Sequence, residues 1–138
     1  MKTVDLNADL GEGSPGEEVL FGVATSVNIA CGGHAGGVAA MRAAVRAARS
    51  AGVSVGAHPG YADPEYFGRR ELSLTPGQVT ALVSAQVALL AGIARDEGVV
   101  LRHVKPHGAL YNQAARDGLL AAAVVAGARA SAPGAGLF

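Results

Sequence analysis

Short apolar runs alternate with longer helix-forming segments along this 138-residue chain. Strands are predicted at Thr3–Leu6, Val27–Ala30, Val53–Ala57 and Val99–Val104, with the start of a fifth at Ala135–Phe138. Helices are predicted between them at Val38–Ala51, Thr75–Gly98 and Ala114–Ala130. Strands that alternate with helices favour a parallel sheet joined by helical crossovers. The pattern therefore predicts an α/β protein, in a single domain that spans residues 1–138.

The helix that follows Thr75 has the clearest boundaries. Thr75 can cap its first turn, Pro76 suits the first helical position, and Gln78 completes the spacing of a capping box. Gly98 is typical of a residue that ends a helix.

Composition excludes several classes of partner. Eleven basic residues balance eleven acidic ones, so no net charge draws the protein to nucleic acid or an anionic membrane. Aromatic residues make up 4% and Trp is missing, which argues against a base-stacking surface. The single cysteine, Cys31, fits a reducing compartment. With no signal-peptide pattern and no predicted membrane span, we expect a soluble cytoplasmic protein, and leave homo-oligomerisation open.

Polar and charged residues follow each predicted strand. In parallel α/β folds, sites lie at the carboxyl ends of the strands, so these residues are expected to gather there. They are Asn7, Asp9 and Glu12 after the first strand, His34 after the second, His58 and Arg69 after the third, and Lys105 and His107 after the fourth.

The run from His103 to Asn112 is the densest of these groups. His103, Lys105 and His107 are two residues apart, so they share a face if the extended backbone continues. Pro106 favours an extended shape at Lys105. A basic triplet at the end of a buried strand predicts a functional site, with His103 inside the strand as a core residue or a support behind that site.

Four motifs, in order, cover most of the chain. They are Asp5–Gly13, Asn28–Gly36, Gly56–Tyr61 with Phe67–Arg70, and His103–Asn112. Together they resemble the LamB/YcsF family, whose members are also called the A component of 5-oxoprolinase. The resemblance implies a parallel (β/α) barrel of the glycoside hydrolase/deacetylase type. A complete barrel needs about 250 residues, so the four to five strands here are expected to form its N-terminal part.

The sequence departs from the family pattern in its second motif. Gly33 stands where the family usually has Phe, and Gly37 and Val38 stand where it has Asp-Pro. An aspartate at position 37 could cap the following helix, and glycine there costs only a few tenths of a kcal/mol. If that aspartate also touches substrate or metal in the family, its replacement would alter activity.

The resemblance also implies the reaction: ATP-dependent opening of 5-oxoproline to glutamate, carried out with subunits B and C. The sequence contains no Walker A motif, so ATP binding is assigned partly or wholly to those partners. Opening a phosphorylated lactam requires a base for water and cations for the phosphate. The candidate catalytic residues are Asp9, His34, His58 and His107. The candidate substrate-binding residues are Asn7, Arg69, Lys105, Tyr111 and Asn112.

Several alternatives stay open. Asp9, His34 and His58 could instead hold a divalent metal such as Zn or Mn. Glu12 is either part of the site or an exposed loop residue. Cys31 is either a nucleophile activated by His34 or, as we favour, a buried inert thiol. The whole protein could also be a stand-alone metal-dependent amide hydrolase or deacetylase, or an inactive, assembly-only half-barrel.

Overall fold

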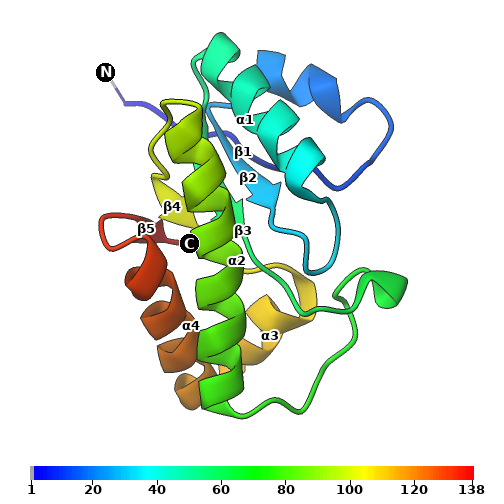
Figure 1. Ribbon diagram of the computed structural model, residues 1–138, viewed down its shortest axis with the longest axis vertical. Helices are drawn as coiled ribbons and strands as arrows, with labels where there is room; N and C mark the ends of the chain where they lie inside the picture. The colour runs from blue at the N-terminus through cyan, green and yellow to red at the C-terminus, as the bar shows by residue number, and fades with distance from the viewer. Residues whose placement is uncertain (1) are drawn as a thin grey trace.

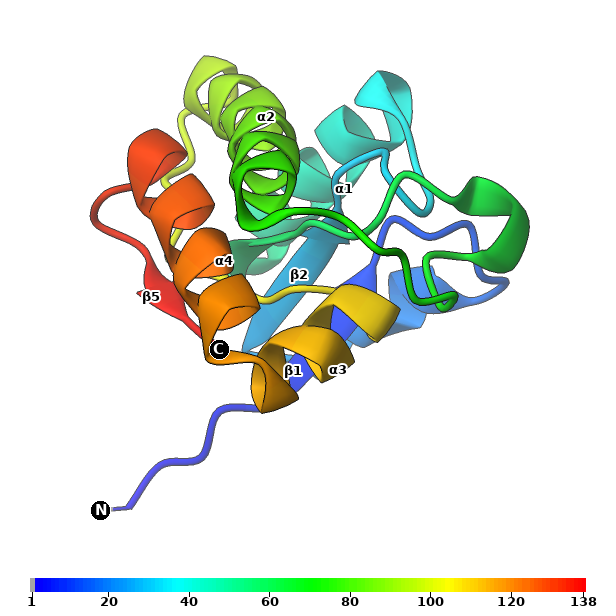
Figure 2. The same cartoon turned by 90° about the horizontal axis from the view of Figure 1, so that it is seen from below.

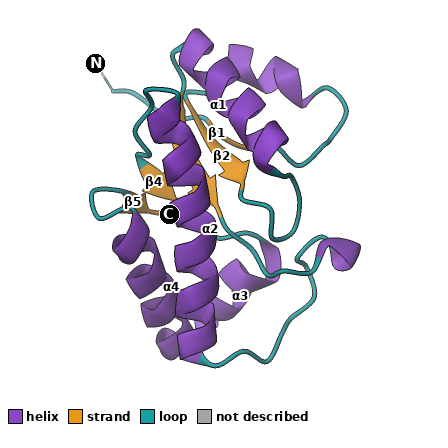
Figure 3. Ribbon diagram, viewed as in Figure 1, coloured by secondary structure: helices purple, strands orange, loops and turns teal. Residues whose placement is uncertain are grey.

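A five-stranded parallel sheet organises the computed structural model, which describes residues 2–138 (Figures 1 and 3). Its strands follow chain order: β1 (Asn7–Leu10), β2 (Ser26–Ala30), β3 (Ser54–His58), β4 (His103–Val104) and β5 (Gly136–Leu137). The α-helices are α1 (Val38–Ala51), α2 (Pro76–Asp96), α3 (Gly108–Arg116) and α4 (Gly118–Ser131), and η1 (Glu17–Gly22) and η2 (Pro64–Tyr66) are 3-10 helices. The predicted α/β fold with a parallel sheet is confirmed.

The two faces of the sheet differ in chemistry. Side chains alternate across each strand, and Leu10, Ile29 and Val55 belong to the buried apolar core. Figure 2 shows α1 and α2 on this side of the sheet, with α4 beside α2. The alternate residues, among them Asp9 and Asn28, hydrogen-bond to one another on the opposite face. The apolar face therefore holds the fold together, and polar groups are left for the other face.

Three predicted elements differ from the observed ones. The first strand lies at Asn7–Leu10 instead of Thr3–Leu6, and β4 is shortened to two paired residues. The helix predicted as continuous over Ala114–Ala130 is two helices. Asp117 separates them, because its carboxylate accepts hydrogen bonds from the backbone N–H groups of Leu119 and Leu120 and so starts α4.

Helix α2 begins with the predicted capping box, in which Thr75 and Gln78 bond each other's backbone N–H groups. By length and hydropathy α2 is the one helix among residues 2–138 that could cross a membrane. Core helices pass the same test, and six residues of α2 are buried, so this is weak support for a membrane span.

Glu97 ties the end of α2 to α1. Its carboxylate accepts hydrogen bonds from Arg42 Nη1 at 2.7 Å and Arg46 Nε at 2.9 Å, and its carbonyl accepts from Arg49 at 2.7 Å. The hydrogen bonds from Arg46 and Arg42 lower the pKa of Glu97 to about 2. Glu97 is therefore ionised wherever the protein is near neutral pH.

Helix α4 packs closely on α2. A Cβ added at Gly127 would lie 2.7 Å from the Thr80 carbonyl oxygen and 2.8 Å from Val83 Cβ. The absence of a side chain at Gly127 thus allows the two helices to approach backbone to backbone.

Candidate active site

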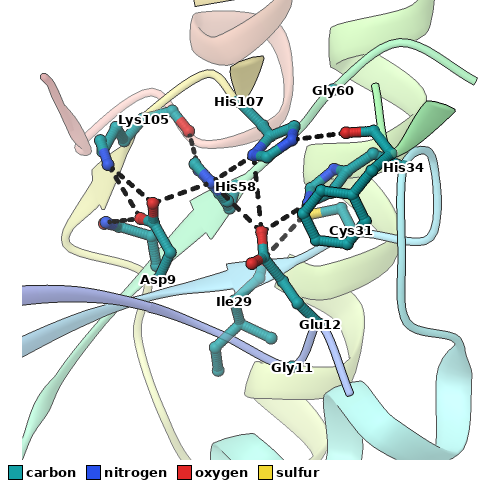
Figure 4. A network of polar contacts seen from close by, with 12 residues as sticks. Asp9, Gly11, Glu12, Ile29, Cys31, His34, His58, Gly60, Lys105 and His107 are labelled. Atoms are coloured by element: carbon teal, nitrogen blue, oxygen red, sulfur yellow. Dashed lines mark hydrogen bonds and ion pairs between the residues drawn. The ribbon is translucent and has the colours of Figure 1, made fainter. Parts of the chain in front are cut away.

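Four residues from four separate segments meet beyond the carboxyl ends of the strands (Figure 4). Glu12 follows β1, His34 follows β2, His58 ends β3, and His107 precedes α3. One ligand-type atom of each lies within 4.8 Å of the others, and the three histidines are buried. The predicted convergence of His34, His58 and His107 is thus present in the structure, and Glu12 joins them.

Backbone carbonyls define which nitrogen carries a hydrogen in two of these rings. His58 Nδ1 lies 2.6 Å from the Lys105 carbonyl oxygen, and His107 Nε2 lies 2.8 Å from that of Phe67. A carbonyl only accepts, so both nitrogens carry the hydrogen. In the neutral rings this leaves lone pairs on His58 Nε2 and His107 Nδ1, which face each other at 3.0 Å. Two lone pairs at that distance repel unless a proton or a metal ion lies between or beside them.

His34 completes the cluster. Its ring stacks on His107 with centroids 3.6 Å apart and planes 5° from parallel, and its Nε2 lies 2.8 Å from Glu12 Oε1. Its buried Nδ1 has no hydrogen-bond partner within residues 2–138. Burial lowers the pKa of His107 to about 4, so this ring is neutral near pH 7, the form that binds metal. The donor set therefore fits a divalent ion such as zinc.

Glu12, unlike Asp9, has a carboxylate oxygen within 4 Å of all three imidazoles. Its Oε1 lies 3.7 Å from His58 Nε2 and 3.5 Å from His107 Nδ1. Burial raises the pKa of Glu12, but the hydrogen bond and charge of His34 outweigh this, so the pKa is lowered overall. The predicted metal set of Asp9, His34 and His58 is accordingly revised to Glu12 with three histidines.

Asp9 belongs to a neighbouring ion pair. Lys105 Nζ donates to its two oxygens at 2.8 and 3.1 Å, Asn28 Nδ2 donates at 2.7 Å, and His58 Nε2 lies 3.4 Å away. Burial raises the pKa of Asp9, but its contacts with His58, Lys105 and Asn28 hold it well below the usual range. A carboxylate with so low a pKa is a weak base, so Asp9 is better suited to orienting its neighbours than to accepting a proton.

A cavity of about 400 Å³ opens beside this ion pair. Four of the five predicted substrate-binding residues line it: Arg69, Lys105, Tyr111 and Asn112. Asp9, His58 and His107 also line it. Asn7 does not line it and instead hydrogen-bonds Ser26 and Asn28 on the polar face of the sheet. A larger opening of about 690 Å³, between the C-terminal ends of α2 and α4, contains none of the candidate catalytic residues.

The loop of residues 59–74 holds the stacked imidazoles. Phe67 and Gly68 both have left-handed backbones, with φ of 54° and 62°. A Cβ at Gly68 would lie 2.7 Å from His34 Cβ and 3.1 Å from His107 Cδ2. This geometry brings the Phe67 carbonyl onto His107, a contact that the sequence did not predict.

The same loop is joined to α3. Ala109 N donates to the Gly68 carbonyl at 3.0 Å, Tyr61 Oη donates to Gln113 Oε1 at 2.6 Å, and Gln113 Nε2 donates to the Leu72 carbonyl at 3.3 Å. The loop and α3 thus form one bonded wall of the site.

Comparison with known proteins agrees with the four motifs. The sequence profile of the LamB/YcsF family matches residues 4–138. The chain belongs to the LamB/YcsF family. It is also similar to a solved structure, the lactam utilization protein from Thermus thermophilus, with a TM-score of 0.94 and 45% sequence identity over 99% of this chain. The chain spans 57% of the length of that protein.

Gly33 and Gly37, which depart from the LamB/YcsF pattern, have very different surroundings in the structure. A Cβ at Gly33 would lie 2.6 Å from the Gly60 carbonyl oxygen and within 2.7 Å of the Gln86 amide, so a larger residue requires these groups to move. Gly37 is the extended N-cap residue of α1 and has nothing within 4 Å of the Cβ position. An aspartate there has room, and its absence leaves α1 without a side-chain cap.

Cys31 is not a nucleophile in this LamB/YcsF chain. It is buried, its Sγ donates to the Ile29 carbonyl at 3.2 Å, and burial raises the pKa of the thiol to about 12. A thiol that stays protonated at neutral pH is inert.

Proposed function

We propose that this chain acts in the opening of the 5-oxoproline lactam to glutamate, as component A of an ATP-dependent 5-oxoprolinase with subunits B and C. Membership of the LamB/YcsF family and similarity to a lactam utilization protein support the substrate class. The observation that carries the proposal is the cavity lined by Arg69 and Lys105, which adjoins buried imidazoles. Cations for an acidic substrate and bases for water are thus next to each other.

The chemistry assigns a task to each group. A lactam is a resonance-stabilised amide. Transfer of the terminal phosphoryl group of ATP to its oxygen removes that resonance, water then adds to the carbon, and the ring C–N bond breaks to leave an acyl phosphate, whose hydrolysis gives glutamate and phosphate. Arg69 and Lys105 would bind the substrate carboxylate or the phosphate. A neutral imidazole, His58 or His107, would accept the proton of the attacking water. ATP binding is assigned to the partner subunits.

As the alternative to an imidazole base, we propose that Glu12, His34, His58 and His107 hold a divalent metal ion, because the lone pairs of His58 and His107 cannot both bind a metal and accept a proton. When bound, such an ion polarises a carbonyl or lowers the pKa of water. The Phe67 and Lys105 carbonyls would keep the two ligating lone pairs directed at it, as partners behind ligating histidines generally do. Titration calorimetry with zinc tests this: binding that His58→Phe abolishes is expected, and no binding to the wild type rejects it.

The parallel sheet also supports a proposal about the architecture of the longer protein fold. We propose that the five strands are the N-terminal part of a (β/α) barrel, since the chain spans 57% of its structural relative. A cytoplasmic location is proposed on the single reduced cysteine.

Glutamate formation tests the function. The protein is mixed with subunits B and C, ATP and 5-oxoproline, and ATP-dependent glutamate is expected. His107→Ala should lower turnover strongly with little effect on folding, and Lys105→Met should mainly weaken substrate binding. Arg129→Met, an exposed change of the same kind on α4, is the matched control and should have no effect. No ATP-dependent glutamate from the wild type would reject the proposal.

A second candidate, a stand-alone metal-dependent amide hydrolase, is favoured by the Glu12 and three-histidine cluster. It predicts amide hydrolysis without ATP or partners, lost on chelation. If the protein instead binds B and C without catalysis in either assay, the assembly-only function remains.

A further inference from the structure

Five residues lie level with one another across the sheet, one from each strand: Asp9, Asn28, Gly56, His103 and Gly136. The glycine in the middle of the row leaves a gap on the polar face. A Cβ at Gly56 would overlap the His103 ring at Nε2. Because that atom is missing, the His103 ring reaches across β3, and its Nε2 comes within 2.5 Å of Asn28 Oδ1.

Asn28 uses the full hydrogen-bonding capacity of its amide. Its Nδ2 donates to Asn7 Oδ1 at 2.5 Å and to Asp9 Oδ1 at 2.7 Å. Its Oδ1 accepts from Asn7 Nδ2 at 3.1 Å and faces His103 Nε2. An amide offers two donors and two acceptor positions. The side chain is fully buried, so each of these bonds replaces a contact with water.

The Asn7 and Asn28 amides bond each other reciprocally, so both could rotate by 180° together and keep their mutual bonds. In that orientation Asn28 Oδ1 would face Asp9 Oδ1. Lys105 Nζ already donates to that oxygen at 2.8 Å, and an ionised carboxylate has no proton to offer. The observed orientation instead requires a hydrogen on His103 Nε2. Asp9 and His103 therefore select the same amide direction.

Phe138 holds the imidazole in this place. Its ring stacks on His103 with centroids 4.3 Å apart and planes 7° from parallel. The His103 side chain is thus confined between Phe138 and the open position over Gly56, with its Nε2 directed along the row.

We propose that Asn28 and His103 form a positioning relay that fixes the direction of the Asp9 carboxylate and, through it, of Lys105 at the mouth of the cavity. Neither relay residue lines that cavity. Without the Asn28 donor, Asp9 keeps its charge and its bonds to Lys105 but loses one of the contacts that fix its direction, so the carboxylate and the Lys105 ammonium group can shift together. The consequence for catalysis rests on the proposed function, whereas the relay itself does not.

Nitrogen NMR tests the relay without any activity. The chain has four histidines, so His103→Gln identifies the His103 signals by their loss. At neutral pH the His103 ring is expected to carry its hydrogen on Nε2, and a ring protonated mainly on Nδ1 would overturn the proposal. In His103→Phe, which keeps the stacking but not the donor, the Asn28 amide signals should broaden, since Asp9 alone then selects the amide direction. In His103→Gln, which keeps a donor, they should stay a single pair, and equal behaviour of the two variants would also overturn it.

Kinetics then test its consequence. His103→Phe should lower kcat/KM by about tenfold, typical for a group that supports a site residue, and His103→Gln should restore it to within about threefold. Ser84→Ala is the control: it removes a part-buried hydrogen bond to Ser131 on α4, and Ser84 bonds none of the residues in the row. Equal losses in the Phe and Gln variants would show that His103 is only structural. An inactive wild type would reject the proposed function and leave the NMR result to decide the relay.

Discussion

Replacing Gly68 by alanine tests whether the loop of residues 59–74 holds the imidazole cluster in place. Gly68 is buried, has φ of 62°, and would bring a Cβ to 2.7 Å from His34 Cβ. Gly98 is the matched control, since it has φ of 70° and nothing within 4 Å of its Cβ position. The two substitutions share the backbone strain and differ only in crowding.

The expected free-energy changes follow from this difference. An alanine forced into the left-handed region costs about 1 kcal/mol, and that is the whole cost expected for Gly98→Ala. Gly68→Ala adds overpacking against two buried rings, about 1–3 kcal/mol. The total expected for Gly68→Ala is therefore about 2–4 kcal/mol. The added methyl group also displaces His34, a proposed metal ligand.

Urea unfolding of both variants measures the two costs, and zinc calorimetry measures the effect on the cluster. Gly98→Ala should keep the zinc affinity of the wild type, and Gly68→Ala should lose about tenfold or more. Equal destabilisation by the two alanines would refute the inferred contact of Gly68 with His34, whatever the zinc result.

Three further predictions concern the helices. The folded-state pKa of Glu97 lies near 2, below its ordinary value of 4.5, so the stability that Glu97 contributes is present above about pH 4.5 and is lost as the pH falls toward about 2. The urea midpoints of wild type and Glu97→Gln should therefore differ near neutral pH and converge in acid. Gly92 lies in open space on α2, so Gly92→Ala should stabilise the protein by about 1 kcal/mol. Gly127 packs against α2, so Gly127→Ala should destabilise it by about 1–2 kcal/mol once overpacking is included. Melting temperatures from calorimetry that shift in the same direction for both variants would contradict this. Gly37→Asp should raise the stability of α1 by about 0.3–1 kcal/mol, and Gly37→Ala should not, as thermal denaturation would show.

Local signals predicted helices better than strands. The start of α2 was predicted correctly because its capping box is formed by residues three apart. The predicted first strand, Thr3–Leu6, begins too early, because of its residues only Leu6 bonds the backbone beside β2, whereas Asn7–Leu10 lies in register with β2. Strand boundaries depend on the pairing partner, which the local pattern does not contain.

Residue type and strand topology were enough to predict which histidines form the candidate site. Parallel strands bring their carboxyl ends together, so three histidines at successive strand ends were expected to meet. The choice of Glu12 over Asp9 depends on the shape of the turn after β1, and the role of Phe67 depends on a backbone carbonyl, which leaves no mark in the sequence. Asn28 is different, because its carboxamide stands between Val27 and Ile29 in a strand whose five residues are all buried, and a polar side chain in an apolar run is visible in the sequence.

The bonding of the loop of residues 59–74 to α3 has a consequence for engineering. Tyr61, Phe67 and Gly68 each bond a residue at or within α3, although at least 40 positions separate the partners along the chain. A graft that exchanges the loop alone keeps a carbonyl on His107 only if the new loop repeats the left-handed turn at Phe67 and Gly68. One that exchanges α3 alone leaves the Tyr61 hydroxyl without its partner unless Gln113 is retained. The two segments are therefore one module, and a chimera of this wall must inherit both from the same parent.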